Sequence, residues 1–148
     1  MAYTENSTFE GGQQGWTPLN LASSVFINIV QNGTARSGRS FLRAITSQRM
    51  GSIALDFSLR LPTPPSLCAL AYVRAAPAQV PVPGIMKFWN LSVPSRLDEN
   101  DTRFVATGDW TLVMCAIDIP PTANPLIRLE FYIDTVQGEL EIDTVSVF

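Results

Sequence analysis

The residues that could do chemistry in this chain are few, and one important type is missing. The 148 residues include no histidine, which excludes a Ser-His-Asp triad and removes the most common general base and metal ligand. Asp98, Glu99 and Asp101 form an acidic cluster in 97–102 that could be read as paired carboxylates for glycoside hydrolysis. Consecutive carboxylates in a polar loop are usually a solvated turn, and no nucleophile elbow, phosphate-binding loop or metal-ligand spacing occurs elsewhere. The sequence therefore predicts a protein that is not an enzyme.

Aromatic side chains are better candidates, because they can anchor a binding partner. Trp89 follows Phe88 in an expected strand, and successive side chains of a strand point to opposite faces. One ring can join a core, and the other then faces outward as an anchor for a sugar ring or a protein. A core or interface role for Trp89 is the alternative. Polar residues of the kind that line a glycan cleft are sparse on the expected strands, except for Arg74 near Tyr72. We therefore expect Trp89, Tyr72 and Arg74 to contact a ligand or partner.

The two cysteines, Cys68 and Cys115, are far apart in sequence and have no spacing that suits a structural zinc ion. Both lie inside apolar runs, which favours buried free thiols. Whether they pair with each other is left open by the sequence.

Composition excludes several classes of protein. The net charge of −3 argues against nucleic-acid binding, which requires a basic face. No apolar run approaches the ~18 residues of a membrane span, so we expect neither nucleic acid nor membrane as a partner. Charged residues make up 16% of the chain, against about 25% in typical domains. With so few charges, part of the surface is expected to be buried against neighbouring subunits.

The elements that must position these residues are almost all strands. Ser52–Leu61 alternates strictly, with its apolar side chains on one face, and Leu126–Ile133 repeats the pattern with Arg128 and Glu130 outward. Further strands are expected at Val25–Val30, Ser40–Thr46, Leu67–Arg74, Ile85–Leu91, Trp110–Ile119 and Glu139–Phe148. These eight or nine short strands, separated by Gly, Pro and Asn turns, predict an all-β, single-domain antiparallel β-sandwich over residues 1–148.

Two local irregularities have expected causes. In Glu139–Phe148 the apolar phase slips between Ile142 and Val145, and a bulge near Asp143 would restore it. The proline-rich segment Ala76–Gly84 reads as an extended loop. That loop is either a plain connector or an arm that contacts a neighbour.

Five segments, in order, resemble carbohydrate-binding modules of families four, nine and twenty-two. The matching segments are Asn6–Trp16 (N-x-x-F-E … G-W), Arg36–Arg43 (S-G … S), Leu67–Ala75 (Y-x-R-A), Gly108–Val113 (G-x-W-x-x-V) and Glu139–Val147 (I-D-x-V-S). The resemblance spans nearly the whole chain and implies a jelly-roll sandwich of the galactose-binding type. It also implies that Trp16 and Trp110 brace the sandwich.

A structural calcium ion is also implied by the resemblance. In such modules a calcium often joins the two ends of the chain, and the matching carboxylates here are Glu10 and Asp143. Main-chain carbonyls of glycine-rich turns could complete the six to eight oxygens that calcium takes. A solvated Glu10 and a bulge-capping Asp143 are the alternative, in which no cofactor is bound.

Two functions are carried forward. The first is a structural virion protein, a bacteriophage head-decoration or tail-surface subunit that forms homo-oligomers or contacts other virion proteins. It is favoured by the low charge, by an initiator Met without an export signal, and by the reuse of jelly rolls in virus particles. This interpretation places the protein in the virion after synthesis in the host cytoplasm. The alternative is a carbohydrate-binding module that binds polysaccharide through surface aromatics, with Trp89 as the leading candidate.

Overall fold

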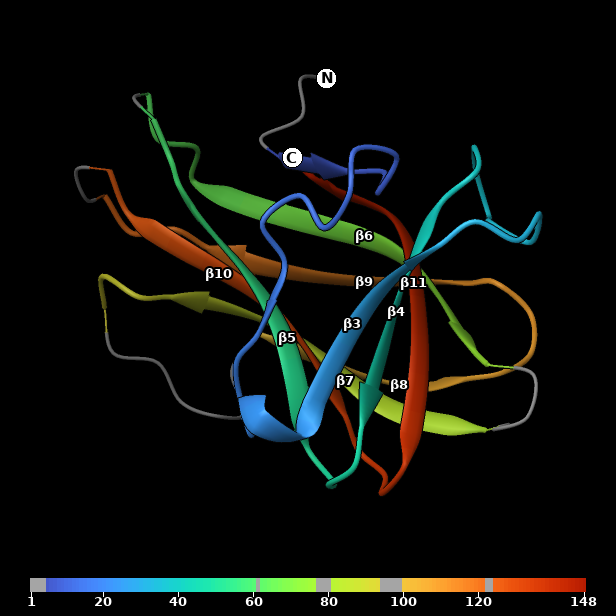
Figure 1. The fold of residues 1–148 in the computed structure, drawn as a ribbon. Coiled ribbons are helices and arrows are strands. Elements are labelled where there is room, and N and C mark those ends of the chain that lie inside the picture. The colour runs from blue at the N-terminus through green and yellow to red at the C-terminus, as the bar shows by residue number, and fades with distance from the viewer. Residues whose placement is uncertain (1–4, 61, 77–80, 94–99, 122–123) are drawn as a thin grey trace.

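The computed structural model describes residues 5–60, 62–76, 81–93, 100–121 and 124–148 (Figure 1). In order, its elements are β1 (Glu5–Ser7), β2 (Thr17–Pro18), the 3-10 helix η1 (Ala22–Ser24), β3 (Val25–Val30), β4 (Phe41–Thr46), β5 (Gly51–Ser58), β6 (Ser66–Ala75), β7 (Val82–Asn90), β8 (Asp101–Ala106), β9 (Thr111–Asp118), β10 (Leu126–Ile133) and β11 (Gly138–Val147).

The strands form two sheets packed face to face (Figure 1). The first sheet has the order β3-β4-β11-β6-β9, with β1 paired to the end of β11. The second sheet has the order β2-β5-β10-β7-β8. Every pairing is antiparallel. The predicted all-β antiparallel sandwich is therefore confirmed.

The core lies between the sheets and follows the predicted alternation. On β10, Ile127, Leu129 and Phe131 are completely buried, so Arg128, Glu130 and Tyr132 point to the outer face of the second sheet. Trp16 is also completely buried, its ring centroid lies 5.6 Å from that of Phe131, and its indole N–H donates to Ser7 Oγ at 3.0 Å. Trp16 is thus a core side chain, as expected.

The bulge expected in the last strand is present. The register of β11 against β6 shifts between Asp143 and Ser146, and Thr144 has a φ of 52°. The extra residue returns Val145 and Val147 to the core, where both are buried. Beyond the bulge, β11 pairs with β1, so the first and last strands lie side by side.

Three strands were not expected from the sequence. The strands β1 and β2 are short, and β8 begins with the polar residues Asp101, Thr102 and Arg103, so none of them shows an apolar period. The strand β7 begins at Val82 and includes Pro83, so the last three residues of the expected Ala76–Gly84 loop are paired with β8. Pro83 has no amide N–H to donate to the ladder, but its carbonyl accepts a hydrogen bond from the Asp134 amide. Residues 77–80 of that loop lie outside the described residues.

The cysteines lie on adjacent strands but on opposite faces of the first sheet. Cys68 pairs in register with Ala116, and Cys115 with Ala69, so their side chains alternate to different sides. Both thiols are free. Cys68 and Cys115 therefore do not form a disulfide with each other in this fold.

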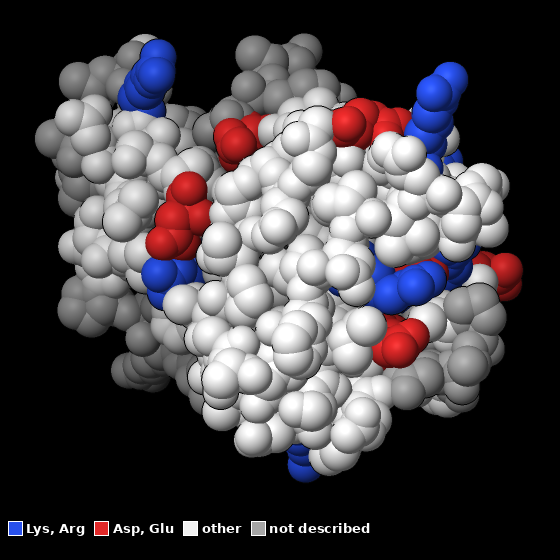
Figure 2. Space-filling model, viewed as in Figure 1, with Lys and Arg blue, Asp and Glu red and all other residues white. Residues whose placement is uncertain are grey.

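Charged side chains are sparse on the surface. On the face seen in Figure 2 they form small groups separated by wide uncharged areas. Apolar side chains stand out on several elements, including Phe26 on β3, which is 65% exposed, and Met114 on β9, which is 54% exposed. Among the described residues, no helix is long and apolar enough to cross a membrane.

Candidate functional site

Trp89 lies on the outer face of the second sheet. Its neighbour Phe88 is completely buried in the core, so strand alternation turns Trp89 the other way. Trp89 is half-buried, which leaves part of its indole ring accessible. The structure thus places this ring on the outward face, as the dipeptide pattern predicts.

The strand register brings polar side chains from neighbouring strands around Trp89. In one row across the sheet, Asp56 of β5 pairs with Arg128 of β10, which pairs with Trp89 of β7. The next two rows on the same face contain Ala54, Glu130, Lys87 and Asp101, and then Ser52, Tyr132, Ile85 and Arg103. This set of outward side chains on β5, β10, β7 and β8 is called the sheet-face site below.

Glu130 is the centre of a hydrogen-bond network that holds Trp89. Its carboxylate is only 2% exposed, although it lies on an outer face. Glu130 Oε1 accepts from the indole N–H of Trp89 at 2.8 Å and from the Tyr132 hydroxyl at 2.9 Å, and Oε2 accepts from the Ser52 hydroxyl. Charge-assisted bonds of this kind are stronger than neutral ones. The network therefore holds the indole in one orientation.

Lys87 completes the support of the ring. Its ammonium lies 4.2 Å from the centroid of the Trp89 ring, within cation–π range, and the residue is 1% exposed. Burial, together with the negative charge of Glu130, raises the pKa of Tyr132 above its usual value. Tyr132 therefore stays a neutral hydroxyl and can donate to Glu130 at all ordinary pH values.

Beside the ring, an ion pair borders a small hollow. Arg128 donates to both carboxylate oxygens of Asp56 at 2.7 and 2.9 Å, and these hydrogen bonds raise the pKa of Arg128. The hollow has a volume of about 140 Å³ and is lined by Gly15, Thr17, Leu19, Ala54, Asp56 and Arg128. An aromatic ring and hydrogen-bonding groups thus lie in a line along the sheet face.

Tyr72 and Arg74 do not belong to this site, because β6 belongs to the first sheet. The guanidinium of Arg36 stacks over the Tyr72 ring at 4.1 Å and donates to its hydroxyl at 3.1 Å. Arg74 donates to Glu141 at 2.7 Å and lies 4.2 Å from the Trp110 ring centroid. These groups bind one another and hold the β3–β4 connection on the first sheet, so the structure does not bring the three predicted contact residues together.

Trp110 lies on this outer face, outside the core between the sheets. Its ring meets Phe41 edge-on with centroids 5.6 Å apart, and its indole N–H donates to the Thr34 carbonyl at 3.0 Å. It braces the β3–β4 connection, which is a structural role of the kind expected for it.

Glu10 and Asp143 both bind one turn of the β3–β4 connection. Asp143 Oδ2 accepts from the Ser37 amide at 3.0 Å, and Glu10 Oε1 accepts from the Arg39 amide. Burial raises the pKa of Asp143, whereas the hydrogen bond from the Arg39 amide lowers the pKa of Glu10. No group of three or more His, Cys, Asp or Glu that could hold a metal occurs among the described residues. The two carboxylates satisfy backbone amides without a metal, and calcium binding by them stays a prediction.

Sequence reasoning did not identify Glu130, Lys87 and Ser52 as site residues. The alternation of Leu126–Ile133 places Glu130 outward, but the meeting of Glu130 with Trp89 depends on the β7–β10 register, which the sequence does not reveal. In the acidic cluster, Asp101 begins β8 opposite Lys87. Asp98 and Glu99 lie outside the described residues.

No protein-family model and no curated protein matches the sequence. Solved structures do match. The xylan-binding CBM22-1 domain of Paenibacillus barcinonensis Xyn10C is 13% identical, with 99% of this chain and 93% of that chain covered and a TM-score of 0.74. The C-terminal family 22 carbohydrate-binding module of Clostridium thermocellum Xyn10B is 16% identical, with 98% and 92% covered and a TM-score of 0.74. TmCBM61, solved with β-1,4-galactotriose, is 16% identical, with 95% and 93% covered and a TM-score of 0.61.

These neighbours are carbohydrate-binding modules, which are non-catalytic domains. They give no support to the interpretation as a virion protein. At 13–16% identity the likeness concerns the fold. Across nearly its whole length, the chain has the β-sandwich fold of carbohydrate-binding modules.

Proposed function

We propose that this protein is a non-catalytic module that binds a polysaccharide chain on the sheet-face site, with Trp89 as the platform for a sugar ring. The observation that carries the proposal is the network around Trp89. A half-exposed indole is held by Glu130 on one side and by Lys87 on its face. The xylan-binding and galactotriose-bound neighbours support a polysaccharide as the class of ligand.

The physical basis is a ring that is already in its bound orientation. Sugar rings present an apolar face that packs on an aromatic ring, while their hydroxyls need hydrogen-bond partners. Because the Glu130 network holds Trp89 in one orientation, little side-chain entropy is lost when a sugar ring binds. Arg128 and Asp56 lie in line with Trp89 across the sheet, so their ion pair is the polar group that the hydroxyls of the next ring would meet along that row.

The carboxylates of the sheet-face site support binding in preference to catalysis. Glycoside hydrolysis requires one protonated and one ionised carboxyl group with free access to the scissile bond. Here Glu130 is buried by its three donors, and Asp56 is engaged by Arg128. Glu130 therefore serves as a structural acceptor, and Asp56 is held in place by its ion pair with Arg128.

The test is electrophoresis through gels containing xylan or β-1,4-galactan, with Trp89→Ala compared with Trp110→Ala. The two tryptophans are both half-buried, but they lie on the outer faces of different sheets. The wild-type protein should be retarded by at least one polysaccharide, Trp89→Ala should lose the retardation, and Trp110→Ala should keep it. Melting temperatures of the three proteins identify any loss that is due to unfolding. Absence of wild-type retardation, or equal loss in both variants, would contradict the proposal.

A further inference from the structure

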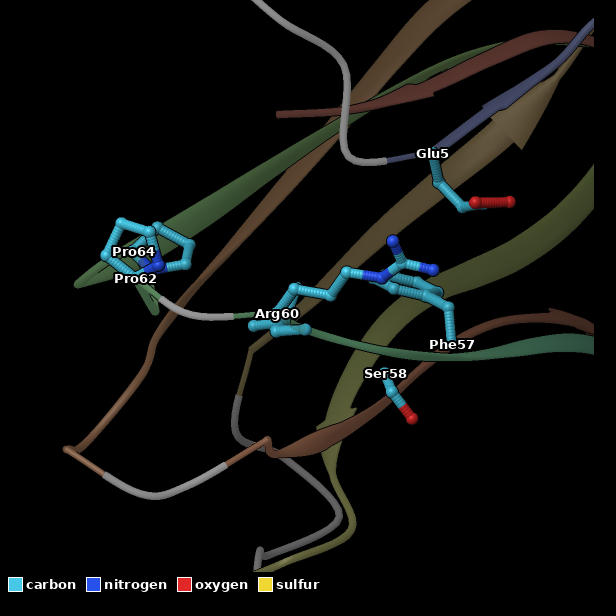
Figure 3. Close-up of a pocket in the computed structure, with 7 residues that line it drawn as sticks. Glu5, Phe57, Ser58, Arg60, Pro62 and Pro64 are labelled. Atoms are coloured by element: carbon cyan, nitrogen blue, oxygen red, sulfur yellow. The ribbon is translucent and has the colours of Figure 1, made fainter.

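A second hollow lies at one end of the sandwich, between the two sheets (Figure 3). Its volume of about 570 Å³ is in the range of small-molecule sites. Glu5 of β1 borders it from the first sheet, and Phe57, Ser58 and Arg60 border it from the end of β5 and the residues after it. Phe57 follows the inward phase of Ile53 and Leu55, so this hollow is separate from the sheet-face site, which lies on the opposite side of β5.

Two opposite charges face this hollow without meeting. In Figure 3, the guanidinium of Arg60 and the carboxylate of Glu5 reach into the same space. Elsewhere in the chain Arg43 pairs with Glu141 at 2.6 Å and Arg128 with Asp56 at 2.7 Å. Within the described residues, the side chains of Arg60 and Glu5 form no ion pair or hydrogen bond. The hollow therefore presents unused donors on one side and unused acceptors on the other.

The remaining lining is apolar and rigid. Phe57 is partly buried and packs against the core, which restricts its ring. Pro62 and Pro64 border the hollow, and their rings fix the backbone φ angle. A flat apolar surface thus lies next to the two charged groups, and the Ser58 hydroxyl points away from them (Figure 3).

We propose that this hollow, formed by Glu5, Phe57 and Arg60, binds a single neutral sugar unit, such as a chain end or a side branch. A simple anion would be repelled by Glu5, and a simple cation by Arg60. Neighbouring hydroxyls of a sugar satisfy both groups, because they accept from the guanidinium and donate to the carboxylate. The apolar face of the ring then packs on Phe57.

The choice of a sugar rests on the proposed function, whereas the site is a different one. The sheet-face site offers the Trp89 ring and the Arg128–Asp56 pair on the outer face of the second sheet, whereas the hollow lies at the sandwich end. Occupation of both by one branched or neighbouring chain would increase the overall affinity through effective concentration.

The experiment follows backbone amide chemical shifts of the isotope-labelled full chain during titration with xylose and, separately, galactose. We expect at least one of the sugars to shift the amides of Glu5 and of residues 57–60. Arg60→Ala and Glu5→Gln should each weaken this response about tenfold, the usual scale for removing a charged hydrogen-bond partner. Arg39→Ala, which removes another exposed arginine, and Trp89→Ala should leave it unchanged.

Three results would overturn the inference. One is the absence of shifts at the hollow with both sugars, and another is an unchanged response in Arg60→Ala and Glu5→Gln. The third is an equal response to sodium acetate, which would reveal a plain anion site. If neither sugar shifts the amides at the hollow, while Trp89→Ala abolishes polysaccharide retardation, only this inference fails. If the hollow responds while no polysaccharide retards the protein, the sheet-face proposal fails and the hollow stands.

Discussion

Glu130 shows how a single carboxylate can organise an exposed surface. It lies on the outer face of the second sheet, where a charged side chain would ordinarily be solvated, yet it is buried by three donors. A buried charge is tolerated when its hydrogen-bonding capacity is used. The three hydrogen bonds offset the cost of that burial, and they hold the Trp89 ring in one orientation.

Removal of Glu130 should therefore affect stability as well as binding. We expect Glu130→Ala to lower the free energy of unfolding by about 1–3 kcal/mol, because the indole N–H and two hydroxyls lose their shared acceptor. Glu130→Gln retains one acceptor oxygen and should lose less. Urea denaturation of the three proteins measures the difference. An alanine variant as stable as the wild type would show that the network contributes nothing to the fold.

Glu10 and Asp143 offer a test of the calcium prediction at the same scale. If they serve only to bind the amides of Arg39 and Ser37, EDTA should leave the melting temperature unchanged, and Asp143→Ala should lower it. Asp143 is completely buried, so its loss leaves the Ser37 amide without its acceptor. A fall in melting temperature with EDTA that added calcium reverses would instead establish the ion.

At the scale of elements, periodic strands were predictable and short or polar ones were not. Ser52–Leu61 and Leu126–Ile133 were identified because burial on one face imposes a period of two. The β11 bulge is predictable for the same reason. The apolar alternation changes phase between Ile142 and Val145, and an extra residue in the strand returns the later apolar side chains to the core. Strand β8 is not predictable from the sequence. Its first residues, Asp101, Thr102 and Arg103, are not buried, so burial imposes no alternation of apolar and polar residues there.

The site was predictable only in part, because it depends on pairing between strands. Trp89 could be placed outward from its neighbour Phe88 alone. Its contact with Glu130 requires that β7 and β10 pair in one register, and a shift by one residue would turn Glu130 to the other face. Residue type alone makes Tyr72, Arg74 and Trp89 look like one binding set, but Tyr72 and Arg74 lie on the first sheet and Trp89 lies on the second.

The cysteines provide a prediction for the pair β6 and β9. Burial, followed by the nearby Cys68 and Asp101, raises the pKa of the Cys115 thiol to about 12. Because the thiolate is the reactive form, a disulfide reagent at neutral pH should label at most Cys68 in the folded protein. Both thiols should react after denaturation. Mass spectrometry of the labelled peptides checks this, and rapid labelling of Cys115 in the folded protein would contradict its burial.

At the scale of the whole molecule, the sparse charge leaves self-association as a prediction. Phe26 and Met114 are exposed on the two edge strands of the first sheet, β3 and β9. Exposed edge strands with apolar side chains favour contact with other chains. We expect sedimentation at increasing concentration to reveal dimers or larger species, and Phe26→Ser with Met114→Ser to reduce them. A monomer at every concentration would contradict the expected burial against neighbouring subunits.

The pairing of β1 with β11 has a practical consequence for how this protein can be handled. Glu5 lies opposite Val147, so the polypeptide enters and leaves the sandwich at one place (Figure 1). A short linker could close the backbone into a circle, and new ends could then be opened in a surface turn. The same geometry makes the sandwich suitable for insertion into a loop of a host protein. Two neighbouring chain segments would then connect it to the host. In that position the sheet face could be directed away from the host, whereas the hollow at the sandwich end, which Glu5 borders, would lie next to the two links.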